Sequence, residues 1–476
     1  MRRLVRLGLI GISALLAACS GSGNSFAPGP LVSTPTPPPP EFRVQLLHAS
    51  PDAPAVNISG IGATLENVDF KGGTGAITAQ SGTFNGVQID GITPAGPVTV
   101  IGPVDLTFNA DTLYSILAIG DLANIQPLIL EQPDTAVAAG NTRVRVVHGA
   151  PAAPEVSVFL TAPGADLQAE MPVGTFEFGD DLGPVDVPAG GPYQIRVTLP
   201  FTPPAAATVV FDSGEITLAD GANLLITAVQ NTTSADALAM DESPISLVLQ
   251  DGTAASELLS IASPAELRVV HASADAPPVD VVVNDDFANP LVPGLTYPNF
   301  APMMGFVSVA ADTYDITVTD SATQSVFPID VDGLALDAGT TYDILAINTL
   351  AMLEPLILTD DYRRVATAAK VRIVHASTVA DGLSPAGVDI YVTTPGTDIS
   401  TVAPTLEDVP FRANTGFLEL AGGNYEVTVT AANDTAPAIP TTPITIADGG
   451  IYTAVARDPD PAVMNDGLGL ILMDDF

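Results

Sequence analysis

The chain has 476 residues, of which 47% are hydrophobic, and its 15 basic and 54 acidic residues give a formal net charge of −39. So acidic a surface repels nucleic acid and anionic lipid headgroups, and we exclude both as partners. A single cysteine cannot form an intrachain disulfide, so each domain must be stabilised by its hydrophobic core.

Residues 1–18 have the features of a signal peptide. Residues 1–6 are basic, and residues 7–16 are apolar but too few to span a bilayer as a mature helix. The letters LAAC at residues 16–19 resemble the lipobox of bacterial lipoproteins. The resemblance implies cleavage before Cys19, a lipid anchor on Cys19 and, from Ser20 at the next position, sorting to the outer membrane, facing either the periplasm or the cell surface. An ordinary secretory signal followed by an unrelated cysteine is the alternative.

Residues 19–40 are predicted to be a tether between the lipid and the first domain. Gly and Ser make its first part flexible, and proline stiffens residues 35–40. After cleavage the chain would keep 12 basic and 54 acidic residues, a formal charge of −42. This acidity is explained either by solubility or by the binding of a divalent cation, calcium in particular. Neighbouring aspartates such as Asp360/Asp361 and Asp474/Asp475 are candidate ligands, but none follows the EF-hand pattern, so we assign no metal ligand and no cofactor.

A motif made of a strand, a histidine and a turn of small residues occurs four times. It reads VQLLHASPDAP at Val44–Pro54, VRVVHGAPAAP at Val144–Pro154, LRVVHASADAP at Leu267–Pro277 and VRIVHAS at Val371–Ser377. The motif contains all four histidines of the chain, which are His48, His148, His271 and His375. A residue type that is used once per repeat and nowhere else marks a structural module.

Each copy of the motif is followed by the same series of elements. An apolar strand comes first, at Val56–Ile58, Val156–Leu160, Val279–Val283 and Val388–Val392. A hairpin with alternating apolar residues, a turn and a last apolar strand follow. The turn precedes Tyr114, Tyr342 or Tyr452, which resemble the tyrosine corner of immunoglobulin-like domains, whereas the second copy has Leu224 there.

These patterns predict an all-β protein with four tandem immunoglobulin-like antiparallel β-sandwich domains. We place repeat 1 at residues 41–134, repeat 2 at 141–251, repeat 3 at 264–361 and repeat 4 at 369–476. The segments between them, 136–141, 253–263 and 362–368, are short and favour a semi-rigid string of domains.

The motif and the Val-Asp-Val strand after it resemble the bacterial family called domain of unknown function 4397. The nearest copies are His48–Pro54 and His271–Pro277; the second copy has Ala152 in place of the aspartate, and the fourth has an insertion after Ser377. The resemblance implies a sandwich fold, tandem domains and a location in the cell envelope. It implies no activity, catalytic residue or cofactor.

The motif histidines are interpreted as structural residues. Residues i and i+2 of a strand share a face, so His148 lies on the same face as Val144 and Val146 and caps the edge of the core. There the imidazole can bond the following Ser, Asp or backbone groups and hold the turn. The alternative is a metal site, but His48 and Asp52 would supply only two ligands, whereas zinc needs three or four.

We predict a protein without enzymatic activity and assign no catalytic residue, because every histidine is used by the repeat and the lone cysteine by the lipid. The leading hypothesis is an envelope lipoprotein acting as a multidomain binding, adhesion or scaffold module, with an unidentified protein or glycan as partner. A structural envelope component without a dedicated ligand is the alternative. A hydrolase of cell-wall polysaccharide is a more distant one.

Changing Cys19→Ala should release the protein from the membrane fraction, because the lipid is the predicted anchor. Fractionation of cells followed by immunoblotting measures the distribution. Retention of the variant in the membrane fraction would contradict the lipoprotein prediction.

Overall fold

The computed structural model describes residues 39–62, 64–203, 205–232 and 243–475. The predicted signal peptide, Cys19 and nearly all of the tether lie outside these residues. Residues from Pro40 to Phe476 form one compact unit. Among the described residues, no helix is both long and apolar enough to cross a membrane.

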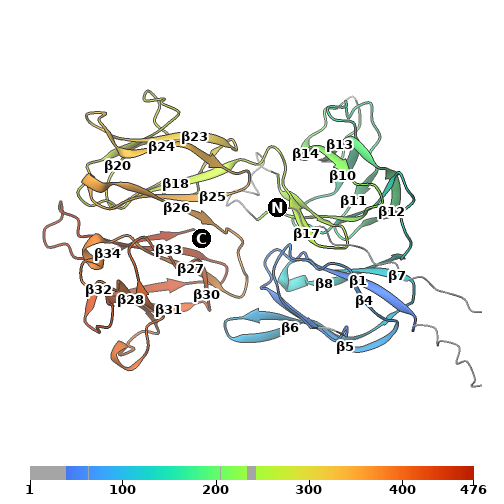
Figure 1. The fold of residues 1–476 in the computed structure, drawn as a ribbon, viewed down its shortest axis with the longest axis horizontal. Helices are drawn as coiled ribbons and strands as arrows, with labels where there is room; N and C mark the ends of the chain where they lie inside the picture. The colour runs from blue at the N-terminus through green and yellow to red at the C-terminus, as the bar shows by residue number, and fades with distance from the viewer. Residues whose placement is uncertain (1–38, 63, 204, 233–242, 476) are drawn as a thin grey trace, which may run out of the picture. The chain divides into compact units, whose positions relative to one another are not determined.

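The all-β prediction is confirmed, and the strands of the described residues form eight sheets, two in each repeat (Figure 1). One sheet of each repeat contains the strand that ends at the motif histidine, and we call it the His sheet; the other is the second sheet. Strand pairs are antiparallel with one exception per repeat. The strand of the motif runs parallel to the strand that follows the tyrosine-corner turn. Nothing in the sequence pattern predicts this parallel pair, because hairpin signals report only on strands that are neighbours in sequence.

Neighbouring strands within a sheet follow a common order in repeats 1 and 2. From edge to edge, the His sheet of repeat 1 has β4 (Ile77–Gln80), β1 (Glu41–His48), β7 (Thr112–Ile119) and β8 (Gln126–Pro133), and its second sheet has β3 (Leu65–Val68), β2 (Val56–Ser59), β5 (Gly82–Thr93) and β6 (Gly96–Phe108). The His sheet of repeat 2 has β12 (Asp181–Pro188), β9 (Asn141–His148), β15 (Asn223–Gln230), β16 (Ile245–Gln250) and β17 (Ala255–Leu258), and its second sheet has β11 (Gly174–Phe176), β10 (Val156–Thr161), β13 (Gly190–Thr198) and β14 (Val209–Leu218).

Repeats 3 and 4 use the same order. Repeat 3 has β21 (Phe300–Ala301) and β22 (Val307–Val309), both beside β18 (Ala265–His271), then β25 (Thr341–Ile347) and β26 (Glu354–Asp360); its second sheet has β20 (Val292–Leu295), β19 (Val279–Val283), β23 (Asp312–Asp320) and β24 (Val326–Leu336). Repeat 4 has β30 (Leu418–Leu420), β27 (Ala369–His375), β33 (Ile451–Arg457) and β34 (Gly469–Asp474), then β29 (Leu406–Val409), β28 (Val388–Thr393), β31 (Gly423–Ala431) and β32 (Pro437–Ile446). The short helices are η1 (Leu122–Asn124), η2 (Leu350–Met352), α1 (Thr378–Asp381) and η3 (Ile399–Thr401).

The tyrosine-corner interpretation is confirmed in the three repeats that have the tyrosine. The backbone N–H of Asn109 donates to the hydroxyl of Tyr114 at 2.9 Å. The corresponding bonds to Tyr342 and Tyr452 are both 3.1 Å long. The hydroxyl therefore satisfies a backbone donor five residues upstream, at the turn that leads into the strand beside the motif strand.

Each His sheet is buried on both faces, and this joins the repeats in pairs. In repeat 1, Leu46 points into the sandwich core, whereas its neighbour Leu47 belongs to a second cluster shared with Val147 and Leu225 of repeat 2. An equivalent cluster joins the His sheets of repeats 3 and 4. The repeat limits set from the sequence stay a prediction, because the packed repeats form one compact unit. In repeat 2, β17 extends the His sheet into a segment that was predicted to be a connector.

A buried ionic network lies between the His sheets of repeats 3 and 4. Asp343 is fully buried and accepts hydrogen bonds from Arg268 Nε at 2.7 Å and Arg372 Nη2 at 2.6 Å. Asp360 also pairs with Arg372, and Asp475 pairs with Arg268. Burial, together with the negative charge of Asp343, raises the pKa of Asp360 from 3.8 to about 8, against the lowering effect of Arg372. Three carboxyls thus share two guanidinium groups, and one carboxyl resists ionisation.

Asp360→Asn should make the free energy of unfolding less dependent on pH. The pKa of Asp360 is higher in the folded than in the unfolded chain, so its contribution to stability is complete at low pH and is lost as the pH rises between the two values. Asparagine keeps an acceptor for Arg372 and has no proton to lose. We expect a flattening of about 1–3 kcal/mol between about pH 5 and 8, measured by urea unfolding.

The matched control is Asp361→Asn, because this neighbouring side chain is 59% exposed and pairs with Lys370 outside the network. The free energy of unfolding of this variant should depend on pH as that of the parent does. The same slope for the parent and Asp360→Asn would show that Asp360 is ionised throughout.

Candidate binding cavity in repeat 2

Three of the four motif histidines hold their own turns closed. Nε2 of His48 lies 3.0 Å from the carbonyl oxygen of Pro54, to which it must donate, and the backbone N–H of Ser50 donates to Nδ1 at 3.3 Å. His148 and His271 make the same bond to the proline six residues later, both at 3.1 Å. Burial is the main cause that lowers the pKa of His48 from 6.5 to about 4, and it also lowers the pKa values of the other three histidines. These rings are neutral at physiological pH.

An aromatic ring stands edge-on to each histidine, a feature that we did not predict from the sequence. The partners are Phe70, Phe178, Tyr297 and Phe411, with ring centroids 5.9–6.5 Å apart. In the described part of the chain, neither ring nitrogen of His375 has a hydrogen-bond partner. The insertion after Ser377 forms α1 and replaces the short turn whose proline carbonyl bonds the ring in the other repeats.

The motif aspartates connect two turns. Asp52 accepts a hydrogen bond from the backbone N–H of Leu122 at 2.7 Å, and Asp275 accepts one from Leu350 at the same distance. Repeat 2 has Ala152 at this position and cannot make the bond. Across the described ranges, no three His, Cys, Asp or Glu side chains are grouped so that they could hold a metal ion.

Three aspartates that we considered as calcium ligands lie in ion pairs. Asp360 pairs with Arg372, Asp361 with Lys370, and Asp475 with Arg268. The positive charge beside each of these carboxylates thus comes from an arginine or lysine of the protein itself. Calcium binding stays a prediction, with no ligand set assigned to it.

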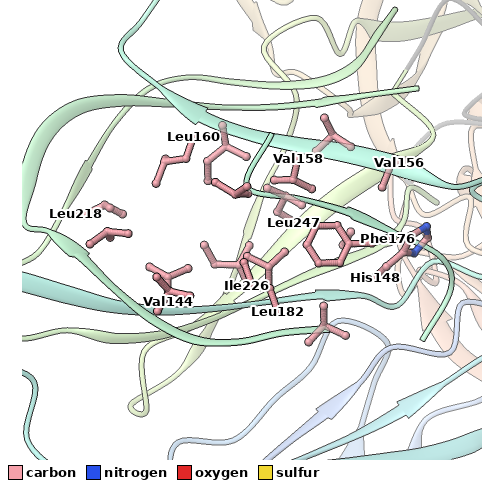
Figure 2. A pocket seen from close by; sticks show the side chains of 18 residues that line it. Val144, His148, Val156, Val158, Leu160, Phe176, Leu182, Leu218, Ile226 and Leu247 are labelled. Carbon is pink, nitrogen blue, oxygen red and sulfur yellow. The ribbon is translucent and has the colours of Figure 1, made fainter. Parts of the chain in front are cut away.

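The interior of the repeat 2 sandwich contains a cavity of about 290 Å³ (Figure 2). Figure 2 shows Val158 and Leu160 of β10 on one side, opposite Val144 of β9 and Ile226 of β15. Leu218 lies at one end of the cavity, and Phe176 and His148 lie at the other (Figure 2). Among the described residues of the wall, His148 alone has a polar side chain, and its Nε2 is already bonded to Pro154.

One end of the cavity, at Leu218, corresponds to a cluster of aromatic rings in repeat 1. In repeat 1, Phe42 and Phe108 stack with their centroids 4.4 Å apart, and Phe84 and Tyr114 pack edge-on against Phe108. The strand registers place four other residues of repeat 2 at these positions: Thr142, Leu218, Tyr193 and Leu224. Repeat 2 therefore has one ring where repeat 1 has four. Smaller side chains in an otherwise unchanged core leave empty volume when the backbone cannot collapse.

The interiors of the other sandwiches contain less empty space or have it at a different edge. The corresponding interiors of repeats 1 and 3 contain spaces of about 50 and 20 Å³. Repeat 4 has a space of about 210 Å³, but its wall includes Thr445, Thr453 and Asp474, and it lies beside β32 and β34 at another edge. Of these four spaces, that of repeat 2 has the largest volume and a wall of almost entirely apolar side chains.

The cavity of repeat 2 reaches the surface between two edge strands. Val173, just before β11, and Val185 of β12 both line the cavity and are each 42% exposed. The pairing of β12 with β9 is irregular between Leu182 and Val185, as at a β-bulge. A bulge bends an edge strand away from its neighbours, and here it lies beside the mouth of the cavity.

One protein family matches the chain. The family model described as "Domain of unknown function (DUF4397)" matches residues 42–159 and 265–384, together half of the chain. No curated protein matches it.

Two solved structures show a weak likeness to the chain. One is a family 26 carbohydrate-binding module from Eubacterium rectale Amy13K in complex with maltoheptaose, with a TM-score of 0.15, 10% identity, and coverage of 44% of this chain and 95% of that one. The other is a family 41 carbohydrate-binding module from streptococcal virulence factors, with a TM-score of 0.16, 12% identity, and coverage of 43% and 95%. At these TM-scores the likeness gives no reason to transfer a ligand.

The family match covers repeats 1 and 3 and the motif strands of repeats 2 and 4, which carry the histidine turns. The chain belongs to the family described as domain of unknown function (DUF4397).

Proposed function

We propose that this chain is a lipid-anchored binding protein of the cell envelope, without enzymatic activity, that takes up an apolar molecule in repeat 2. The observation that carries the proposal is the cavity of about 290 Å³ between the two sheets of this repeat. An engineered apolar cavity of about 150 Å³ stays dry and binds benzene or xenon. A natural cavity of about twice that volume, with a mouth at the surface, is suited to the same kind of ligand.

The wall of the cavity favours an apolar ligand over a glycan or an ion. A sugar or an ion would leave its water without gaining hydrogen bonds from the wall, and such burial is costly. The wall offers Val, Leu, Ile and Phe side chains, and the one imidazole in it is engaged by Pro154. A protein or glycan partner for the outer surfaces of the repeats stays a separate prediction.

The remaining repeats support a scaffold role within this proposal. Repeats 1 and 2 share one buried cluster, and repeats 3 and 4 share another. This packing gives repeat 2 a rigid environment, in which a cavity cannot easily close. The predicted lipid on Cys19 would keep the whole unit at a membrane, where apolar molecules are abundant. A purely structural envelope component would have no use for the cavity.

The test is binding of the uncharged fluorescent probe N-phenyl-1-naphthylamine to the compact unit from Pro40 to Phe476. We expect saturable binding. The variant Leu218→Phe places in the cavity wall the ring that repeat 1 has as Phe108, so it should fill part of the cavity and weaken probe binding about tenfold or more. The same variant should unfold at an equal or higher urea concentration, because a filled cavity stabilises the fold.

Met464→Gln is the control, since this side chain of repeat 4 is 90% exposed and the change removes surface apolarity without touching the cavity. It should bind the probe like the parent. Absence of saturable binding, or equal binding by the filled variant and the parent, would overturn the proposed function.

A further inference from the structure

From the shape and charge of the same site, we infer that the ligand of repeat 2 is a single unbranched aliphatic chain with an uncharged head group. This inference rests on the proposed function and narrows it. It combines the volume between the two sheets, the chemistry of the wall and the charge of the segment that forms the mouth.

The volume of the cavity sets the length of the aliphatic ligand. The cavity of about 290 Å³ is close to twice the size of one that holds the six carbons of benzene, which corresponds to roughly twelve carbons. Its space is long rather than round, since it extends from Leu218 to Phe176 between the two sheets (Figure 2). An aliphatic chain can fill a slot of this kind along its whole length.

The closed end cannot accept a polar head. His148 and Phe176 close it, and the imidazole is bonded to Pro154. The head group must therefore stay at the mouth, beside Val173 and Val185, while the chain extends inward.

The segment that contains both mouth valines is acidic. The segment from Ala162 to Pro188, which contains β11, β12 and both mouth valines, has six acidic residues and no basic residue. Glu170 and Glu177 in this segment are exposed. Two of the six acids form ion pairs with arginines of β9, Asp181 with Arg145 and Asp186 with Arg143. A third arginine, Arg196 of β13, donates to the carbonyl oxygen of Ala165 in this segment at 2.7 Å. Because the six acids outnumber these three arginines, a carboxylate or phosphate head would meet net repulsion here, and an alcohol or ester would not.

The experiment displaces N-phenyl-1-naphthylamine from the compact unit with 1-alkanols of increasing length and with the matching carboxylates. Alkanol affinity should rise about fourfold per methylene, equal to about 0.8 kcal/mol, and level off near twelve carbons. Decanoate at about pH 8, where it is ionised, should bind about tenfold more weakly than 1-decanol.

The double variant Glu170→Gln/Glu177→Gln tests the charge of the mouth. It should strengthen the binding of decanoate severalfold and leave that of 1-decanol unchanged. Equal affinity of the parent for decanoate and 1-decanol would overturn the uncharged head group. Equal affinity of the parent and the double variant for decanoate would also overturn it.

Failure of this inference is distinguishable from failure of the proposed function. If the probe binds and the alkanols show no dependence on length, the cavity takes apolar molecules but not aliphatic chains, and the inference is wrong. If probe binding per molecule falls as the protein concentration rises, a second copy of the chain covers the mouth, and the inference is again wrong. If no probe binds, the proposed function itself is wrong.

Discussion

The fold depends on the burial of the His sheet on both faces. An ordinary sandwich sheet has one apolar and one polar face, but here the strands at the centre of the sheet have apolar residues on both. Leu46 and Leu47 of β1 point to opposite sides, and both are buried. A repeat alone would expose one of these faces to water, so each repeat packs its His sheet against that of its neighbour.

This constraint determines which parts of a repeat can vary. The central strands and the histidine at the end of the motif strand lie beside the packing between repeats and are alike in all four copies, and the short motif turn is alike in three. The far end of the sandwich, where repeat 1 has Phe42 and Phe108, lies away from that packing and differs between copies. Repeat 2 has Leu218 where repeat 1 has Phe108, and Leu218 lies at one end of the cavity. The smaller side chain leaves volume in a frame that the packing between repeats keeps from collapsing.

Much of the architecture could be predicted from the sequence, because period-two alternation and the four histidines report on local structure. The tyrosine corner also follows from a local pattern, and Leu224 was identified as its exception. The cavity could not be predicted from that exception alone. It requires Leu218 to face the same space as Val144 and Ile226, and this follows only from the parallel pairing of β9 with β15 and the pairing of β13 with β14. The same holds for the edge-on aromatic partner of each histidine, since Phe70 and Phe411 are distant in sequence from the rings that they contact.

The central claim is that repeat 2 contains a dry and accessible cavity. A crystal structure of the unit from Pro40 to Phe476 under xenon pressure tests this claim most directly. Xenon enters apolar cavities without needing polar partners. Electron density for xenon is expected between Val158 and Ile226 in repeat 2, and none is expected in the filled interior of repeat 3. A repeat 2 core that has closed around Leu218, or that contains ordered water and no xenon, would contradict the claim.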